Sequence, residues 1–177
     1  YWAFTRKGIA ASNIWEAGGL IKSDPTAAYP DLQYHFGPVG FEYANNKIIL
    51  NQAFAIHLDI LRPKSRGNVS LCSSNPLDKP ILNFNYLDHT DDLRNLYKAV
   101  HRTRDLVSQR AFKNLAGREL FDSANAKSDA DIENWIRHNV ETDFHPCGTC
   151  KMGVDDMAVT DDQGRVHGID GLRVVDA

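Results

Sequence analysis

Residues 52–61 read Gln-Ala-Phe-Ala-Ile-His-Leu-Asp-Ile-Leu and carry the clearest strand pattern in the chain. Large apolar side chains recur at every second position, at Phe54, Ile56, Leu58 and Ile60. Because successive side chains of a strand point to opposite faces, this alternation predicts a strand with one buried face. We interpret His57, on the other face, as a strand residue rather than a metal ligand, because no carboxylate or cysteine pattern accompanies it.

The residues before this strand predict a second one. Residues 31–36 alternate polar and apolar side chains, which predicts a half-buried strand with Leu32, Tyr34 and Phe36 on one face. The Gly-Pro pair that follows is expected to end it. Residues 14–21 predict a short extended piece. Residues 41–51 give no clear pattern apart from an Asn-Asn turn.

The residues after this strand predict a turn and then a strand that runs back antiparallel to it. Residues 62–67 contain proline and glycine and predict a turn, and residues 68–72 read as a short strand. Together they predict an antiparallel hairpin with residues 52–61. A further strand is expected within 81–87.

Two helices are predicted in the later part of the chain. The first covers residues 90–108, with Thr90 as N-cap and two aspartates that suit its positive end. The second runs from residue 129 to 140, with Ser128 as N-cap. Their apolar stripes, which predict packing faces, consist of Leu93, Leu96, Tyr97, Val100 and Val107, and of Ile132, Trp135, Ile136 and Val140.

Strands first and helices later predict an α+β fold, with a largely antiparallel sheet and helices packed on one of its faces. A chain of 177 residues can bury one sizeable core, so we expect one domain over 1–177. The net charge of −3 gives no basic field for nucleic acid, and no apolar run is long enough to span a membrane. The 3 cysteines do not form a disulfide framework and are typical of a reducing, cytoplasmic compartment.

The most informative stretch for chemistry is 144–153, Phe-His-Pro-Cys-Gly-Thr-Cys-Lys-Met-Gly. Pro146 disfavours the helical conformation for His145, and the glycines permit close backbone approach. A histidine held in so stiff a loop suits general acid–base work, because imidazole titrates near neutrality. The alternative is a structural loop with a surface histidine.

The cysteines of this stretch leave other classes of function open. A Cys-x-x-Cys pair can be a redox dithiol, but the residues after Cys150 begin a helix poorly and no βαβ unit surrounds it. A zinc site could use Cys147, Cys150, His145 and His167, but His167 is isolated in the sequence. A non-catalytic interaction module is the third alternative. We expect no metal.

The order of the motifs points to a known family. The stretch 144–153 is followed by Arg-Val-His-Gly at 165–168 and Gly-Leu-Arg-Val-Val-Asp-Ala at 171–177. This order resembles the C-terminal region of the glucose–methanol–choline (GMC) oxidoreductases, in particular their choline-dehydrogenase and alcohol-dehydrogenase branch. Segments 11–19, 31–36 and 61–67 fit as well, so the resemblance covers nearly the whole chain.

The resemblance implies a substrate-binding domain of the predicted architecture and a flavoenzyme that oxidises an alcohol. FAD would accept the hydride, and His145 would act as the base. The backbone near Pro146 and Cys147 would lie close to the flavin, and Asp176 and Ala177 would contact FAD. His167 is interpreted as structural.

Two departures from the family pattern shape our expectations. The chain lacks the Gly-x-Gly-x-x-Gly strand–helix unit that cradles FAD, and it ends at Ala177, before the family's second active-site residue. We therefore expect a substrate-binding fragment without an FAD-binding domain, with 144–177 as active-site loop and return segment toward that domain. Alone it should be inactive and prone to self-association, and the full-length enzyme could associate with the inner face of the membrane. The substrate, choline or another primary alcohol, and the electron acceptor, oxygen or a quinone-linked chain, stay open.

Overall fold

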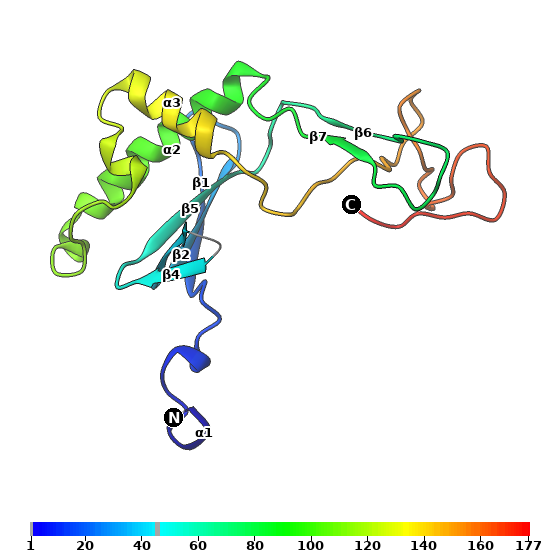
Figure 1. Ribbon diagram of the computed structural model, residues 1–177. Helices are drawn as coiled ribbons and strands as arrows, with labels where there is room; N and C mark the ends of the chain where they lie inside the picture. Colours follow the sequence, from blue (N-terminus) through cyan, green and yellow to red (C-terminus); the bar gives the residue numbers. More distant parts are fainter. Residues whose placement is uncertain (1, 45–46) are drawn as a thin grey trace. The chain divides into compact units, whose positions relative to one another are not determined.

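The computed structural model describes residues 2–44 and 47–177 and has an α+β architecture with antiparallel strand pairs (Figure 1). The predicted fold class is thus confirmed, although the described strands form three small sheets instead of one. The chain divides into two compact units, residues 1–64 with 89–139, and residues 65–88 with 140–177. That residues 1–177 fold as one domain stays a prediction.

The main sheet belongs to the first unit and has the order β1-β2-β5. It consists of β1 (Ala17–Ile21), β2 (Leu32–Gly37) and β5 (Ala55–Ile60), all antiparallel. The register pairs Leu32 with Ile60 and Tyr34 with Leu58, so the two predicted apolar faces coincide. Leu32 and Tyr34 are buried, as the alternating pattern predicts.

The helix α2 (Thr90–Ser108) covers this buried face, and α3 (Asp129–Asn139) packs against α2 (Figure 1). The Tyr34 hydroxyl donates to the carbonyl of Ala99 at 3.3 Å, which joins β2 to α2. The core contains Leu93, Ala99, Val100, Ile132 and Ile136. Helices on one face of a sheet are the arrangement that the sequence predicted.

The two helix starts differ in how well the sequence predicted them. Ser128 caps α3, because its hydroxyl accepts from the Asp131 N–H at 3.2 Å. The prediction of Thr90 as cap of α2 is wrong by one residue. His89 is the N-cap, and its ring nitrogen accepts from the Asp91 N–H at 3.2 Å. An imidazole nitrogen thus takes the place of the expected hydroxyl.

The remaining elements of the first unit are short. They are α1 (Trp2–Thr5), the 3₁₀ turns η1 (Ile9–Ala11), η2 (Arg110–Phe112) and η3 (Asp122–Asn125), and the hairpin of β3 (Gly40–Ala44) with β4 (Lys47–Asn51). The expected Asn-Asn turn between these strands lies outside the described residues. Strands of 5 residues show little periodicity, which is why this stretch gave no clear pattern.

The second unit contains a hairpin that the sequence misassigned. β6 (Asn68–Ser70) pairs with β7 (Ile81–Asn83), and β5 pairs with β2. The predicted hairpin of residues 52–61 with 68–72 is therefore wrong. β5 is half-buried beside β2 under α2, whereas β6 is exposed along its length.

Residues 140–177 form loops held by isolated backbone bridges. Across the described ranges, none of the helices combines the length and the apolar character needed to cross a bilayer.

Candidate active site

His145 lies in a loop of the second unit and is highly accessible. Its side chain is 86% exposed. The side chains of its neighbours Phe144, Pro146 and Cys147 are exposed too, and Cys150 is half-buried. The imidazole is therefore presented by the backbone of the loop and not by packing of the ring.

The histidine loop and the end of the chain are joined directly. The N–H of Gly148 donates to the carbonyl of Ala177 at 2.7 Å. Gly148 has φ +88°, a left-handed conformation that glycine adopts without steric cost, and a Cβ placed there would meet no atom within 4 Å. The structure thus joins Ala177 to Gly148, the residue that follows Cys147, and leaves an open surface beside Gly148.

The segment that ends at Ala177 is anchored further back. The Val174 N–H donates to the Gly164 carbonyl at 2.9 Å, and the Val166 N–H to the Leu172 carbonyl at 3.0 Å. Asp176 is exposed, and its carboxylate accepts from the Ala177 N–H at 2.8 Å. Asp176 and Ala177 therefore lie at the accessible end of a segment that backbone hydrogen bonds hold in place.

A buried threonine anchors the other end of the loop. Thr160 is 1% exposed, and its carbonyl accepts from the Gly153 N–H at 2.9 Å. The Lys151 carbonyl accepts from the N–H groups of Val159 and Thr160, at 2.8 and 3.2 Å. The Nε2–H of His167 donates to the Gly153 carbonyl at 3.0 Å, a contact that fits its interpretation as a structural residue.

The cysteine motif lacks the geometry of its alternative functions. The three cysteines are free thiols. No helix starts at Cys147 to favour its thiolate. Within the ranges that the structure describes, the ligand atoms of Cys147, Cys150, His145 and His167 do not gather into a metal-binding group. The loop as described therefore favours neither a dithiol nor a zinc site.

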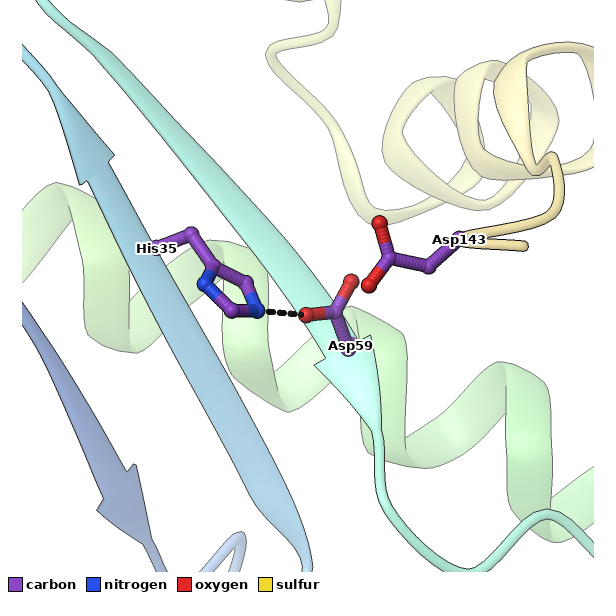
Figure 2. Close-up of side chains that lie close together, drawn as sticks. All are labelled: His35, Asp59 and Asp143. Carbon is purple, nitrogen blue, oxygen red and sulfur yellow. Dashed lines mark ion pairs between the residues drawn. The ribbon is translucent and has the colours of Figure 1, made fainter. Parts of the chain in front are cut away.

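A polar cluster on the main sheet escaped the sequence analysis. His35 Nε2 lies 2.9 Å from Asp59 Oδ2 (Figure 2). The Gln33 side-chain amide approaches the same nitrogen to 2.9 Å. Positions 33 and 35 alternate with the buried 32 and 34, so the cluster lies on the face opposite the helices. The signal that could have found it was the polar half of the alternation in 31–36.

An aromatic ring lies against this cluster. The ring of Trp15 packs edge-on against His57, which faces His35 in the register, with centroids 4.6 Å apart. A Cβ at Gly37 would lie 2.9 Å from the Trp15 ring, so a larger residue there would have to displace the ring. An open hollow of about 530 Å³ adjoins these residues, lined among others by Trp15, Gly18, Gln33 and His35.

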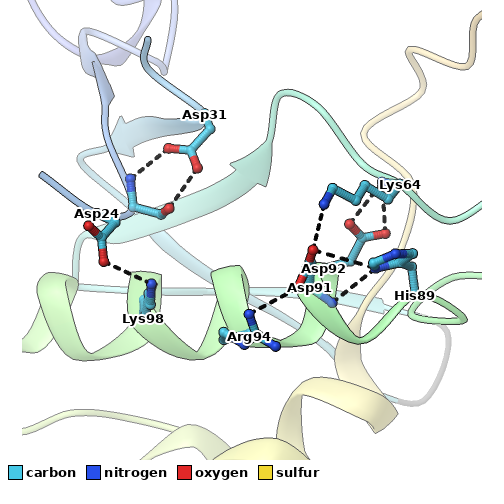
Figure 3. A network of polar contacts seen from close by, with 9 residues as sticks. Asp24, Asp31, Lys64, His89, Asp91, Asp92, Arg94 and Lys98 are labelled. Carbon is cyan, nitrogen blue, oxygen red and sulfur yellow. Dashed lines mark hydrogen bonds and ion pairs between the residues drawn. The ribbon is translucent and has the colours of Figure 1, made fainter. Parts of the chain in front are cut away.

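A second polar network, at the start of α2, has a structural role (Figure 3). The Asp92 carboxylate accepts from the backbone N–H of Lys64 at 2.9 and 3.2 Å, and the residue is 2% exposed. The Lys64 ammonium lowers the pKa of Asp91, with a smaller contribution from Arg94. These contacts tie the end of the 61–64 turn to the helix.

Comparison with known proteins identifies the same family as the order of the motifs. The family model described as GMC oxidoreductase matches residues 63–177. The oxygen-dependent choline dehydrogenase of Klebsiella pneumoniae subsp. pneumoniae is 45% identical over 176 residues, which cover 99% of this chain and 32% of that protein. The enzyme of the same name from Ectopseudomonas mendocina is 44% identical, with 99% and 31% covered. The chain thus spans about a third of the length of the curated relatives it matches.

Solved structures agree on the fold. Pyridoxine 4-oxidase from Mesorbium loti superposes with a TM-score of 0.75 at 27% identity, over 90% of this chain and 32% of that one. A formate oxidase gives 0.68 at 25% identity, over 84% and 27%. A variant of the Aspergillus oryzae formate oxidase, studied for its effect on FAD modification, gives 0.69 at 25% identity, over 85% and 27%. By family model, relatives and fold, this chain belongs to the GMC oxidoreductase family.

Proposed function

We propose that this chain is the substrate-binding part of an FAD-dependent oxidoreductase that converts an alcohol to an aldehyde. One observation carries the proposal: the Gly148–Ala177 hydrogen bond joins the His-Pro loop to the Val-Val-Asp-Ala segment, at 2.7 Å. Both motifs belong to the family pattern, and their contact makes one accessible surface.

Oxidation of an alcohol removes a hydroxyl proton and a carbon-bound hydride, and FAD supplies the hydride acceptor when it is bound. In our proposal His145 takes the hydroxyl proton, for which its exposed ring is free to approach a substrate. Pro146, Cys147, Asp176 and Ala177 would hold the cofactor. The open space beside Gly148 fits the close approach of a planar ring system.

The relatives' names suggest choline as the first substrate to test and oxygen as the first electron acceptor. The partner that we propose is the remainder of the full-length protein, with the FAD-binding domain.

The test uses the purified full-length protein and a panel of alcohols that includes choline. We expect a yellow protein whose flavin is bleached by an alcohol without oxygen and reoxidised by air. A colourless protein, or a flavin that no alcohol in the panel reduces, would contradict the proposed function. Replacing air with a quinone analogue as acceptor decides between oxygen and a quinone-linked chain.

We also propose a cytoplasmic location, supported by the free thiols of Cys72, Cys147 and Cys150. Fractionation of cells tests it, including association of the full-length enzyme with the inner face of the membrane. Recovery outside the cytoplasm and its membrane face would contradict it.

A further inference from the structure

The residue before His145 has an unusual backbone conformation. Phe144 has φ +59°, in the left-handed region that bulky L-residues rarely adopt. Its ring is 85% exposed, so burial of the ring does not impose this conformation. On the other side, Pro146 restricts His145 to extended conformations. The direction of the imidazole therefore depends on what holds Phe144.

The side chain of Thr142 supplies that support. The N–H of Phe144 donates to Oγ1 of Thr142 at 3.0 Å. Such a hydrogen bond from residue i+2 to a threonine hydroxyl at i closes a tight turn. Asp143 lies between them, but its Oδ2 is 3.9 Å from His145 Nε2, which is too long for a hydrogen bond that would orient the ring.

We infer that Thr142 is a positioning residue for His145. Its hydroxyl holds Phe144 in the left-handed conformation, and this conformation sets the direction in which the loop presents the imidazole. Without this hydrogen bond, Phe144 relaxes to negative φ, and the imidazole of His145 moves away from the substrate. The inference rests on the proposed role of His145 as base. Proton transfer needs heavy atoms within about 2.6–3.2 Å, so a displaced base loses rate.

The first experiment compares T142V and T142S in the full-length enzyme. Valine keeps the shape of threonine without the acceptor, and serine keeps the acceptor. We expect T142V to lower kcat by about 10–100-fold with KM and FAD content nearly unchanged, and T142S to stay within about threefold of wild type. An unaffected T142V, or a T142S as impaired as T142V, would overturn the inference.

A double-mutant cycle tests the route through Phe144. Asparagine adopts left-handed conformations more readily than phenylalanine, so F144N should need less support from Thr142. The loss caused by T142V should therefore be smaller in the F144N background than in wild type. Equal losses in both backgrounds would refute this route.

The variant H145A separates this inference from the proposed function. If H145A is fully active, the role of His145 as base fails. If H145A is inactive while T142V turns over like wild type, only the positioning role of Thr142 fails.

Discussion

The imidazole of His145 is 86% exposed and stands on a loop whose ends are tied by backbone hydrogen bonds. Replacing it removes the base without disturbing a packed core. We expect H145A in the full-length enzyme to lower kcat by about 10²–10⁴, as loss of a general base does, with FAD content retained. Steady-state kinetics and the flavin absorbance of the same preparation measure both. H138A, at an exposed histidine of α3, is the matched control, and wild-type turnover of H145A would contradict the assignment.

The cysteines beside His145 should tolerate replacement, because both are free thiols. We expect C147S and C150S, alone and together, to keep activity within about tenfold and to lose on the order of 1 kcal/mol of stability each. Kinetics, denaturation and a zinc assay measure the outcome. Stoichiometric zinc, or a Cys147–Cys150 disulfide under reducing conditions, would show that the motif has a role that we have not assigned.

Among the secondary-structure elements, α2 depends on a buried carboxylate at its start. Asp92 is 2% exposed and accepts from the Lys64 N–H through both oxygens (Figure 3). D92A leaves that donor without its partner, so we expect a loss of about 1–3 kcal/mol in the free energy of unfolding. Urea denaturation measures it. D105A, at an exposed aspartate of the same helix, should change stability by less than about 0.5 kcal/mol, and equal losses would contradict a specific role of Asp92.

The turn at 161–165 should make stability depend on pH. Hydrogen bonds, above all from the backbone N–H of Arg165, lower the pKa of Asp161 to about 2. A carboxylate whose pKa is lower in the folded than in the unfolded state stabilises the fold above the unfolded value. That contribution is lost as the pH falls from about 4 to 2.

We therefore expect D161N to be less stable than wild type at pH 6, with the difference shrinking between about pH 4 and 2. Urea midpoints measured across this range test the prediction. D162N, at the exposed neighbour, is the control. A difference between D161N and wild type that is independent of pH would show that the charge of Asp161 is not responsible.

For the whole molecule, the prediction concerns residues 1–177 produced alone. They lack the Gly-x-Gly-x-x-Gly turn that holds a pyrophosphate, so we expect a colourless, inactive protein after incubation with FAD and desalting. We also expect self-association, because the second unit exposes the apolar side chains of Val69, Leu71, Leu77 and Leu82. Absorbance and light scattering measure the two outcomes. Retained flavin, or alcohol-dependent dye reduction, would mean that these residues hold a complete active site.

The sequence by itself determined the elements and the family. The apolar periodicity of residues 52–61 predicted β5, and that of residues 90–108 predicted α2. Such periodicity depends only on neighbouring residues and so does not depend on the tertiary arrangement. The order of the motifs around His145 identified the GMC oxidoreductases, which the family model and the relatives confirm. The role of His145 itself stays a prediction.

Only the tertiary structure decided which segments meet. β5 pairs with β2 and not with β6, because this pairing places the apolar side of β5 next to the buried side of β2, under α2. The His35–Asp59 pair depends on that register, and the Gly148–Ala177 bond joins residues far apart in the chain. The sequence pattern could not predict these contacts, because a pattern describes only residues that are close in sequence. The free energy that selects a long-range pairing comes from apolar surface that two distant segments bury together.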